Sequence, residues 1–508
     1  MQAKYQREAG CGGTAFESHG EYHLPDYAGD LKKILSTSAR VVPAGRFFGE
    51  DEVQFGGAVQ YDFWYLDAEN RLTHEGFTTD YEFSCPHAEQ TDGTASVSIA
   101  HFSLRPSGPR RISAKATLQA RVQMREEAEY ALECEMDPAL LQTAQRSIPV
   151  GRMFFSKPEE REYAEALPLP APYAAGAEVA FCEGFVQIER AEADEGGVVL
   201  HGTYAVSAVL MADGAAPLRV AEEYALEERL PLEGTREGMD VMASGFFSSL
   251  TTNLSREEDG ARLTFHGICE LSAAAAGNEQ ITVVEDAFAV GGRGEAEFEV
   301  LSHDCFGPSQ TALRTVELRL SIGDAASEIP DGIFHTTVML KNEAHEMKER
   351  ELFYTAEAEI CALGFFADEA GKMHYTAHKS SAPFSVQIPL VSAPLPDGKV
   401  SVEASVGLCE GRMDEGAIET RFCLMLSVCN QAQRQCSCVS RIRALEGTRS
   451  GRPPSYEVYY PSEGESLWSI AKRYGVSPAS LAAANHIAVS SAGAAQNLPS
   501  LLLIDCRK

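Results

Sequence analysis

Few residues of this chain have the type and spacing that enzyme chemistry requires. Gly371-Lys372 could belong to a phosphate-binding loop, but the upstream glycine of such a loop is absent. His345-Glu346 has no second histidine four residues on, so the pair does not predict a zinc peptidase. No Gly-x-Ser-x-Gly sequence is present that could hold a nucleophilic serine. We therefore expect no catalytic residues and no enzymatic activity.

The cysteines are the next candidates for chemistry, as metal ligands or disulfides. Cys429, Cys436 and Cys438 form the only tight group, without the Cys-x-x-Cys pairs or nearby histidines that are typical of zinc sites. Residues 1–9 have no apolar core, so no secretory signal is expected, and no apolar run is long enough to span a membrane. We expect reduced thiols in a cytoplasm, no metal and no cofactor.

The pattern that indicates binding lies near the C-terminus, in residues 455–506. Ser466 can cap a helix, and Gly475 suits the left-handed position that ends one. Ser477-Pro478 can begin a second helix. The first helix has apolar residues at the spacing of one helical face: Leu467, Ile470, Ala471 and Tyr474. With short strands at 457–460 and 501–504, the pattern predicts a small βααβ unit.

These residues resemble the LysM family. The resemblance is carried by Tyr456-x-Val458, by residues 464–477, by Leu481 and by Asn485. LysM modules bind N-acetylglucosamine polymers such as peptidoglycan and chitin through two loops, which correspond here to 462–467 and 485–497. The resemblance implies a partner- or glycan-binding site at these residues: Gly464, Glu465, Ser466, Leu467, Trp468, Asn485, His486 and Ile487.

Aromatic residues of this unit allow more than one interpretation. Trp468 lies off the apolar stripe of its helix, so it is either an exposed anchor for a protein partner or a residue that packs on a neighbouring loop. Tyr459 and Tyr460 alternate along a strand, so we expect one in the core and the other exposed.

Charge separates the C-terminal unit from the rest of the chain. The net charge is -31, from 43 basic and 74 acidic residues. Residues 455–508 are neutral and residues 439–454 carry +3, which leaves -34 on residues 1–438. Such an acidic body disfavours nucleic acid and anionic lipid as partners. Exposed strand edges would allow self-association, which the acidic excess would oppose.

Most of residues 38–440 is expected to be β-strand. Short β-branched and aromatic runs alternate with Gly, Asp, Asn and Pro turns, and residues 112–124 alternate between apolar and polar, as in a sheet with one wet side. An opening strand, a turn, an apolar run and a long alternating strand recur from Gly57, Gly202 and Glu357. The sequence therefore predicts a mainly β chain with three copies of one antiparallel module before the βααβ unit.

Composition sets the expected boundaries. Prolines 158, 168, 170 and 172 predict a stiff, extended linker. The expected organisation is an N-terminal segment (1–37), β module 1 (38–128), a linker (129–178), β module 2 (179–290), a connecting segment (291–329), β module 3 (330–440), a basic linker (441–454) and the LysM unit (455–506).

The whole chain resembles the SPOCS-domain proteins of spore-forming Firmicutes, and among them the SipL-like spore-morphogenesis family. Residues 24–27, 30–35, 57–66 and 111–122 carry this resemblance. It implies a non-enzymatic spore-coat scaffold in the mother-cell cytoplasm, at the forespore surface or in the coat. Its LysM unit would recruit a coat-basement protein, a SpoIVA-type ATPase. The alternative is a LysM protein that binds peptidoglycan or chitin; a LysM-targeted hydrolase has no supporting motif.

Overall fold

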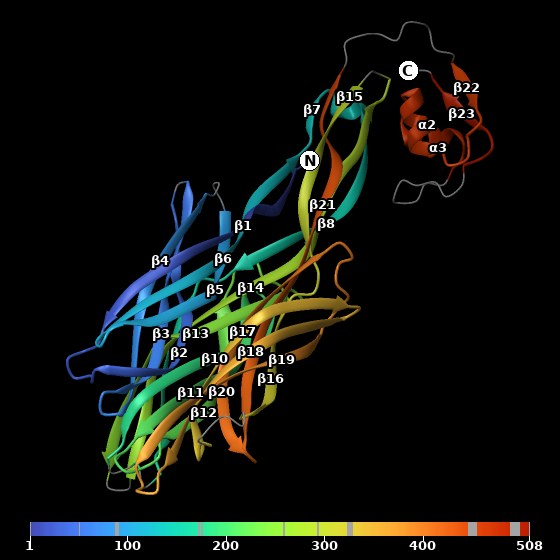
Figure 1. Ribbon diagram of the computed structural model, residues 1–508. Coiled ribbons are helices and arrows are strands. Elements are labelled where there is room, and N and C mark those ends of the chain that lie inside the picture. Colours follow the sequence, from blue (N-terminus) through green and yellow to red (C-terminus); the bar gives the residue numbers. More distant parts are fainter. Residues whose placement is uncertain are drawn as a thin grey trace.

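The computed structural model describes residues 2–49, 51–86, 91–170, 173, 176–257, 260–291, 294–322, 329–444, 455–487 and 498–506. The chain is mainly β, which confirms the predicted fold class, and the two α-helices whose bounds the structure describes are short and lie near the C-terminus. An elongated body narrows into a neck, and the C-terminal unit, residues 455–506, lies beside the far end of this neck (Figure 1). Neither described helix has the length and apolar character needed to cross a bilayer.

The first β unit consists of two three-stranded antiparallel sheets. Their strand orders are β1-β6-β5 and β2-β3-β4. Side chains alternate between buried and exposed along residues 112–124, as predicted, and the buried face packs against Val59 and Tyr61 of the other sheet. The strands are β1 (Gln2–His23), β2 (Leu31–Phe48), β3 (Glu52–Asp67), β4 (Leu72–Pro86), β5 (Thr91–Gly108) and β6 (Arg111–Ala131).

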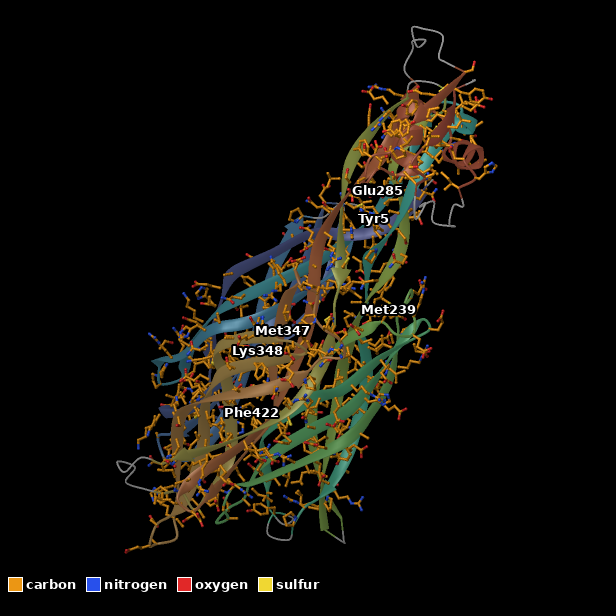
Figure 2. The ribbon with its side chains drawn as sticks, turned by 90° about the vertical axis from the view of Figure 1, so that its right-hand side faces the viewer. Tyr5, Met239, Glu285, Met347, Lys348 and Phe422 are labelled. Carbon is orange, nitrogen blue, oxygen red and sulfur yellow. The ribbon has the colours of Figure 1, made fainter. Side chains whose placement is uncertain are left out.

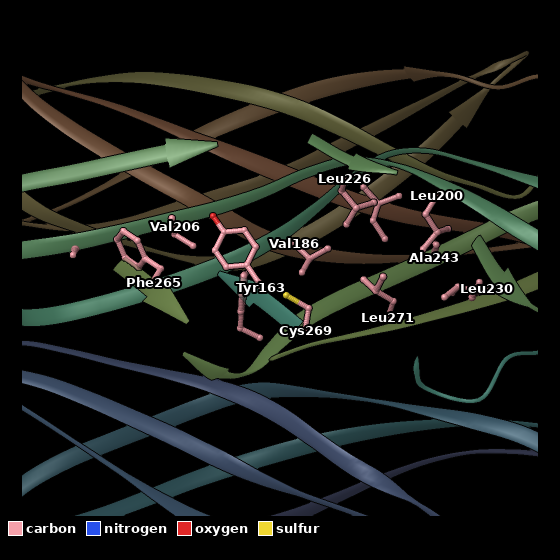
Figure 3. Packing of buried hydrophobic residues seen from close by; sticks show 14 of the residues in the cluster. Tyr163, Val186, Leu200, Val206, Leu226, Leu230, Ala243, Phe265, Cys269 and Leu271 are labelled. Carbon is pink, nitrogen blue, oxygen red and sulfur yellow. The ribbon is translucent and has the colours of Figure 1, made fainter. Parts of the chain in front are cut away.

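The second β unit has the same order of pairing. Its strands pair as β9-β14-β13 and β10-β11-β12, and the two groups join edge to edge at Phe185 and Phe246. Leu200, Val206, Phe265 and Leu271 belong to its core (Figure 3). The strands are β9 (Glu159–Pro168), β10 (Glu178–Asp194), β11 (Gly197–Met211), β12 (Leu218–Pro231), β13 (Asp240–Glu257) and β14 (Gly260–Ala289).

The third β unit repeats the order again, as β16-β21-β20 and β17-β18-β19. Phe422 of β21 is buried in its core (Figure 2). That the three units are copies of one module stays a prediction. The strands are β16 (Gln310–Ser321), β17 (Gly332–Lys348), β18 (Glu351–Ala367), β19 (Met373–Pro389), β20 (Lys399–Asp414) and β21 (Ala417–Ala444).

The structure differs from the sequence prediction between the expected modules. The expected N-terminal segment, residues 1–37, contains β1 and the beginning of β2. The expected linker 129–178 contains β8 (Leu141–Phe155) and β9, both paired with β14. The connecting segment 291–329 contains β15 (Gly294–Phe306) and β16, both paired with β21. Polar side chains and terminal prolines fit such strands because an edge strand keeps one side in water. Between β6 and β8 lie β7 (Glu133–Glu135) and the 3-10 helix η1 (Pro138–Leu140).

The last strand of each β unit continues into the neck. The ends of β6, β14 and β21 meet there with β7, β8 and β15, and Figure 2 shows Tyr5 and Glu285 at this level. Tyr130 of β6 is fully buried between the other two strands. Its hydroxyl accepts a hydrogen bond from the Val284 amide at 3.1 Å and donates one to the Val439 carbonyl at 2.8 Å. Burial raises the pKa of Tyr130, so the hydroxyl keeps its proton. One side chain therefore joins all three β units.

The three β units also meet around Trp64 of β3. Its ring lies 5.9 Å from that of Phe181 in β10 and 5.6 Å from that of Phe334 in β17. Polar groups accompany this aromatic junction: Glu183 of β10 accepts a hydrogen bond from Ser207 at 3.2 Å. Burial raises the pKa of Glu183 to about 7, although Arg219 and the Ser207 hydroxyl oppose the shift. The junction therefore holds an acid that is costly to ionise.

Removing the Tyr130 hydroxyl should destabilise the chain. In Tyr130→Phe the Val284 amide and the Val439 carbonyl lose their partner while buried, so the free energy of unfolding should fall by about 1–3 kcal/mol. Denaturant unfolding measures the change. Tyr27→Phe is the control, because Tyr27 is 85% exposed. Equal losses in the two variants would contradict a joining role for Tyr130.

The junction should make stability depend on pH. Because the folded-state pKa of Glu183 is raised, its contribution is complete below pH 4.5 and is lost as pH rises through about 7. One proton accounts for at most about 1.4 kcal/mol per pH unit. Glu183→Gln should remove this loss, so the variant should gain stability relative to the native chain as pH rises across that window. Parallel stability profiles, measured by denaturant unfolding between pH 4.5 and 8, would show that Glu183 is not responsible.

Candidate binding site in the C-terminal unit

The C-terminal unit has the predicted βααβ order. It consists of β22 (Tyr456–Tyr459), α2 (Leu467–Tyr474), α3 (Pro478–Ala484) and β23 (Leu502–Asp505), with β22 and β23 antiparallel. Ser466 caps α2 by accepting a hydrogen bond from the Ser469 amide, and Gly475 ends it with φ 65°. Ser477 caps α3 in the same way. The buried side chains of the unit are Leu467, Ile470, Ala471, Leu481, Ala482, Leu502 and Ile504, while Tyr474, the fourth residue of the predicted helical face, is half-buried against them.

The first candidate loop, 462–467, is held in shape by Glu465. Its carboxylate accepts hydrogen bonds from the Tyr459 hydroxyl at 2.6 Å, the Ser462 amide at 2.9 Å and the Arg473 guanidinium at 2.8 Å. The Tyr459 hydrogen bond is the largest cause of a lowered pKa at Glu465, so the carboxylate stays ionised. Glu465 therefore positions the loop from within, and Gly464, with φ 84°, supplies the turn before it.

The second candidate loop begins at Asn485. The Asn485 amide nitrogen donates to the carbonyls of Leu481 and Leu503, each at 2.8 Å, and its oxygen accepts from the Leu503 amide at 2.6 Å. These contacts fasten the end of α3 to β23. The Ile487 side chain packs against the core of the unit, whereas His486 is exposed and has φ 54°. Residues 488–497, the remainder of this loop, lie outside the described residues.

The predicted site residues therefore divide into two groups. Gly464, Ser466 and His486 are exposed in the complete chain and can meet a ligand. Five others shape the unit from within or fix it to the chain: Glu465, Leu467, Trp468, Asn485 and Ile487.

Trp468 packs within the chain, but against strand β14 and not on the neighbouring loop that its second interpretation named. Its indole nitrogen donates to Asp286 Oδ2 at 2.8 Å, and its ring meets Phe288 edge-on, with ring centroids 4.9 Å apart. Lys472, one turn further along α2, binds Asp286 Oδ1 at 2.5 Å. The Gly291 amide donates to the carbonyl of the residue that ends α2. Trp468 is thus the contact that docks the C-terminal unit on the end of β14 and not an exposed anchor for a partner.

Sequence reasoning missed Asp286 and Phe288 as the other half of this contact. The available signal was weak: Glu285 and Asp286 interrupt a mostly apolar run from Ile281 to Ala289. An acid pair within a buried strand suggests a partner for at least one carboxylate. Glu285 binds Arg146 at 3.3 Å, which leaves Asp286 for the C-terminal unit. Tyr459 is half-buried and packs against the core, whereas Tyr460 is 68% exposed, in line with their predicted alternation.

The three cysteines of the tight group are buried along β21 in different places, Cys429 in one apolar cluster and Cys436 and Cys438 in another. Cys436 accepts a hydrogen bond from Arg146 at 2.7 Å, and Cys429 and Cys438 are buried free thiols. Within the ranges that the structure describes, no cluster of three or more His, Cys, Asp or Glu residues has the geometry to hold a metal ion.

Comparison with protein-family models matches residues 462–491 to the LysM domain. No curated protein and no solved structure matches the chain. The chain therefore contains a C-terminal LysM domain, the C-terminal unit described above, and this family points to peptidoglycan or another carbohydrate as ligand. The match leaves residues 1–461 outside it, and their resemblance to SPOCS-domain proteins stays a prediction.

The docking contact can be tested by tryptophan fluorescence, because the chain has only two tryptophans and Trp64 is 2% exposed. Asp286→Ala removes the acceptor of the Trp468 indole and the ion pair with Lys472. Trp468 should then move into water, and the emission maximum should shift to longer wavelength. Glu285→Ala is the matched control, since Glu285 binds Arg146 instead. Unchanged emission in Asp286→Ala would contradict the docked arrangement.

Proposed function

We propose that the chain is a non-enzymatic scaffold whose LysM domain binds a polymer of N-acetylglucosamine, such as peptidoglycan or chitin. The observation that carries the proposal is the exposure of described residues in the first candidate loop and at the start of the second, residues 485–487. Docking on β14 uses the Trp468 and Lys472 side of α2, while Gly464, Ser466 and His486 stay exposed in the complete chain. The domain can therefore be fixed to the neck and bind a ligand at the same time.

The loop chemistry suits a neutral sugar. Residues 455–508 have no net charge, and a glycan of N-acetylglucosamine presents hydroxyl and acetamide groups, which pair with backbone and hydroxyl groups. Glu465 makes its three hydrogen bonds within the domain before any ligand arrives. A loop that is already ordered loses less entropy on binding.

A second candidate function follows from the resemblance to the SPOCS-domain proteins. The chain would be a spore-coat scaffold in the mother-cell cytoplasm, at the forespore surface, and the LysM domain would recruit a SpoIVA-type ATPase. Three β units with one order of pairing, followed by a single LysM domain, support this candidate. Co-purification of such an ATPase with the full chain, and its loss when residues 455–508 are deleted, would favour it. Retention by the shortened chain would exclude a recruiting role for the LysM domain.

The glycan proposal predicts that the full chain binds N-acetylglucosamine hexamer in a calorimetric titration. His486→Gly should weaken binding about fivefold, the effect of one lost hydrogen bond of about 1 kcal/mol. Glycine adopts the left-handed backbone of His486 without strain, so the loss reports on the side chain. His19→Gly, in an exposed position on the first β unit, should bind as the native chain does. No heat of binding at millimolar hexamer would refute the proposal.

A further inference from the structure

Arg219 of β12 connects the second and third β units through only one of its donor atoms. Its Nη1 atom lies 3.5 Å from Oε1 of Glu410 on β20. Its Nε and Nη2 atoms are buried and have no hydrogen-bond partner among the residues that the structure describes. The Arg219 side chain is 14% exposed, whereas that of Glu410 is 48% exposed. Buried donors without a partner are costly, so a second acceptor within reach would stabilise this side chain.

Glu183 of β10 is placed to be that second acceptor. It lies opposite Ser207 of β11. Arg219 lies opposite Val209, two residues further along the same strand. Because side chains alternate along a strand, Glu183 and Arg219 share one face of the sheet. Two strand spacings of about 4.8 Å and about 7 Å along the strand separate their backbones, a distance that extended arginine and glutamate side chains can bridge together.

The carboxyl group of Glu183 has few partners of its own. It accepts a hydrogen bond from the Ser207 hydroxyl at 3.2 Å and forms no ion pair in the described part of the chain. Burial raises its pKa to about 7, so it is uncharged at mildly acidic pH and ionises near neutral pH. The charged or titratable groups on the strands packed against this carboxyl are Arg40, Asp62, His74, Cys182, Arg219 and Cys409.

Arg219 is the cation with donors left for a charge on Glu183. The other nearby cation, Arg40, already donates to Gln60 through Nε at 3.1 Å and through Nη2 at 2.9 Å. His335 of β17 lies close to Arg219, but burial lowers its pKa to about 3, so it carries no charge near neutral pH. A negative charge that forms on Glu183 therefore has one cation with buried, unpartnered N–H groups beside it.

We infer that Arg219 exchanges Glu410 for Glu183 when Glu183 releases its proton to water. With Glu183 uncharged, Arg219 holds Glu410 and joins the second β unit to the third. With Glu183 ionised, the Nε and Nη2 atoms of Arg219 bind its carboxylate in charge-assisted hydrogen bonds, which are stronger than the 3.5 Å contact with a half-exposed acid. The ion pair then lies within the second unit, so the contact between the two units should loosen above neutral pH.

Thiol labelling of Cys409 in the full chain tests this exchange. Cys409 precedes Glu410 on β20 and is 6% exposed, so its reaction with iodoacetamide, followed by peptide mass spectrometry, reports opening of the contact. Glu183→Gln cannot ionise and should keep Arg219 on Glu410 at every pH. The native chain should react at the same rate as Glu183→Gln at pH 6 and about fivefold faster at pH 8. Comparison at one pH removes the effect of pH on the thiol itself.

Two further variants define the open arrangement. Arg219→Gln and Glu410→Gln each remove the ion pair between the units, so both should react about fivefold faster than Glu183→Gln at either pH. Cys269, which is fully buried in the core of the second unit, is the control thiol and should react equally in all four chains. A native chain that matches Glu183→Gln at both pH values, or a Glu410→Gln variant that does so, would overturn the inference.

Discussion

The hydrogen bonds of the Tyr130 hydroxyl are the contact on which the arrangement of the chain depends. They connect β6 with Val284 of β14 and Val439 of β21, the closing strands of all three β units. Both partners lie next to β-bulges, where the regular ladder is interrupted and a backbone group is left for a side chain. Two residues beyond Val284, Asp286 receives Trp468 of the LysM domain. The same irregular segment of β14 therefore closes the neck and positions the binding domain.

This arrangement assigns different physical tasks to different parts of the chain. The body has large apolar cores inside its sheets and carries the acidic excess. The neck joins the three β units to one another and carries the LysM domain. The LysM domain, neutral and docked by one side of a helix, keeps Gly464, Ser466 and His486 exposed.

Local patterns in the sequence predicted the local structure well. Alternation predicted the buried side of residues 112–124, and Ser466, Gly475 and Ser477 predicted both helices because capping depends on nearby residues only. Strands β1, β8 and β9 were missed because polar edge strands have little alternation and depend on partners far along the chain. That the two loops form a binding site stays a prediction. The contact of Trp468 with Asp286 was not predicted, because Asp286 is 182 residues away and no local pattern links them.

Hydrogen exchange of the full chain, with and without N-acetylglucosamine hexamer, tests the central claim that the docked LysM domain is the recognition end of the molecule. The account predicts slower exchange at residues 462–467 and 485–487. Amides at 286–291 should exchange as before, because docking and glycan binding use different sides of the domain. Protection confined to the β units, or exchange that does not change at millimolar hexamer, would contradict the account.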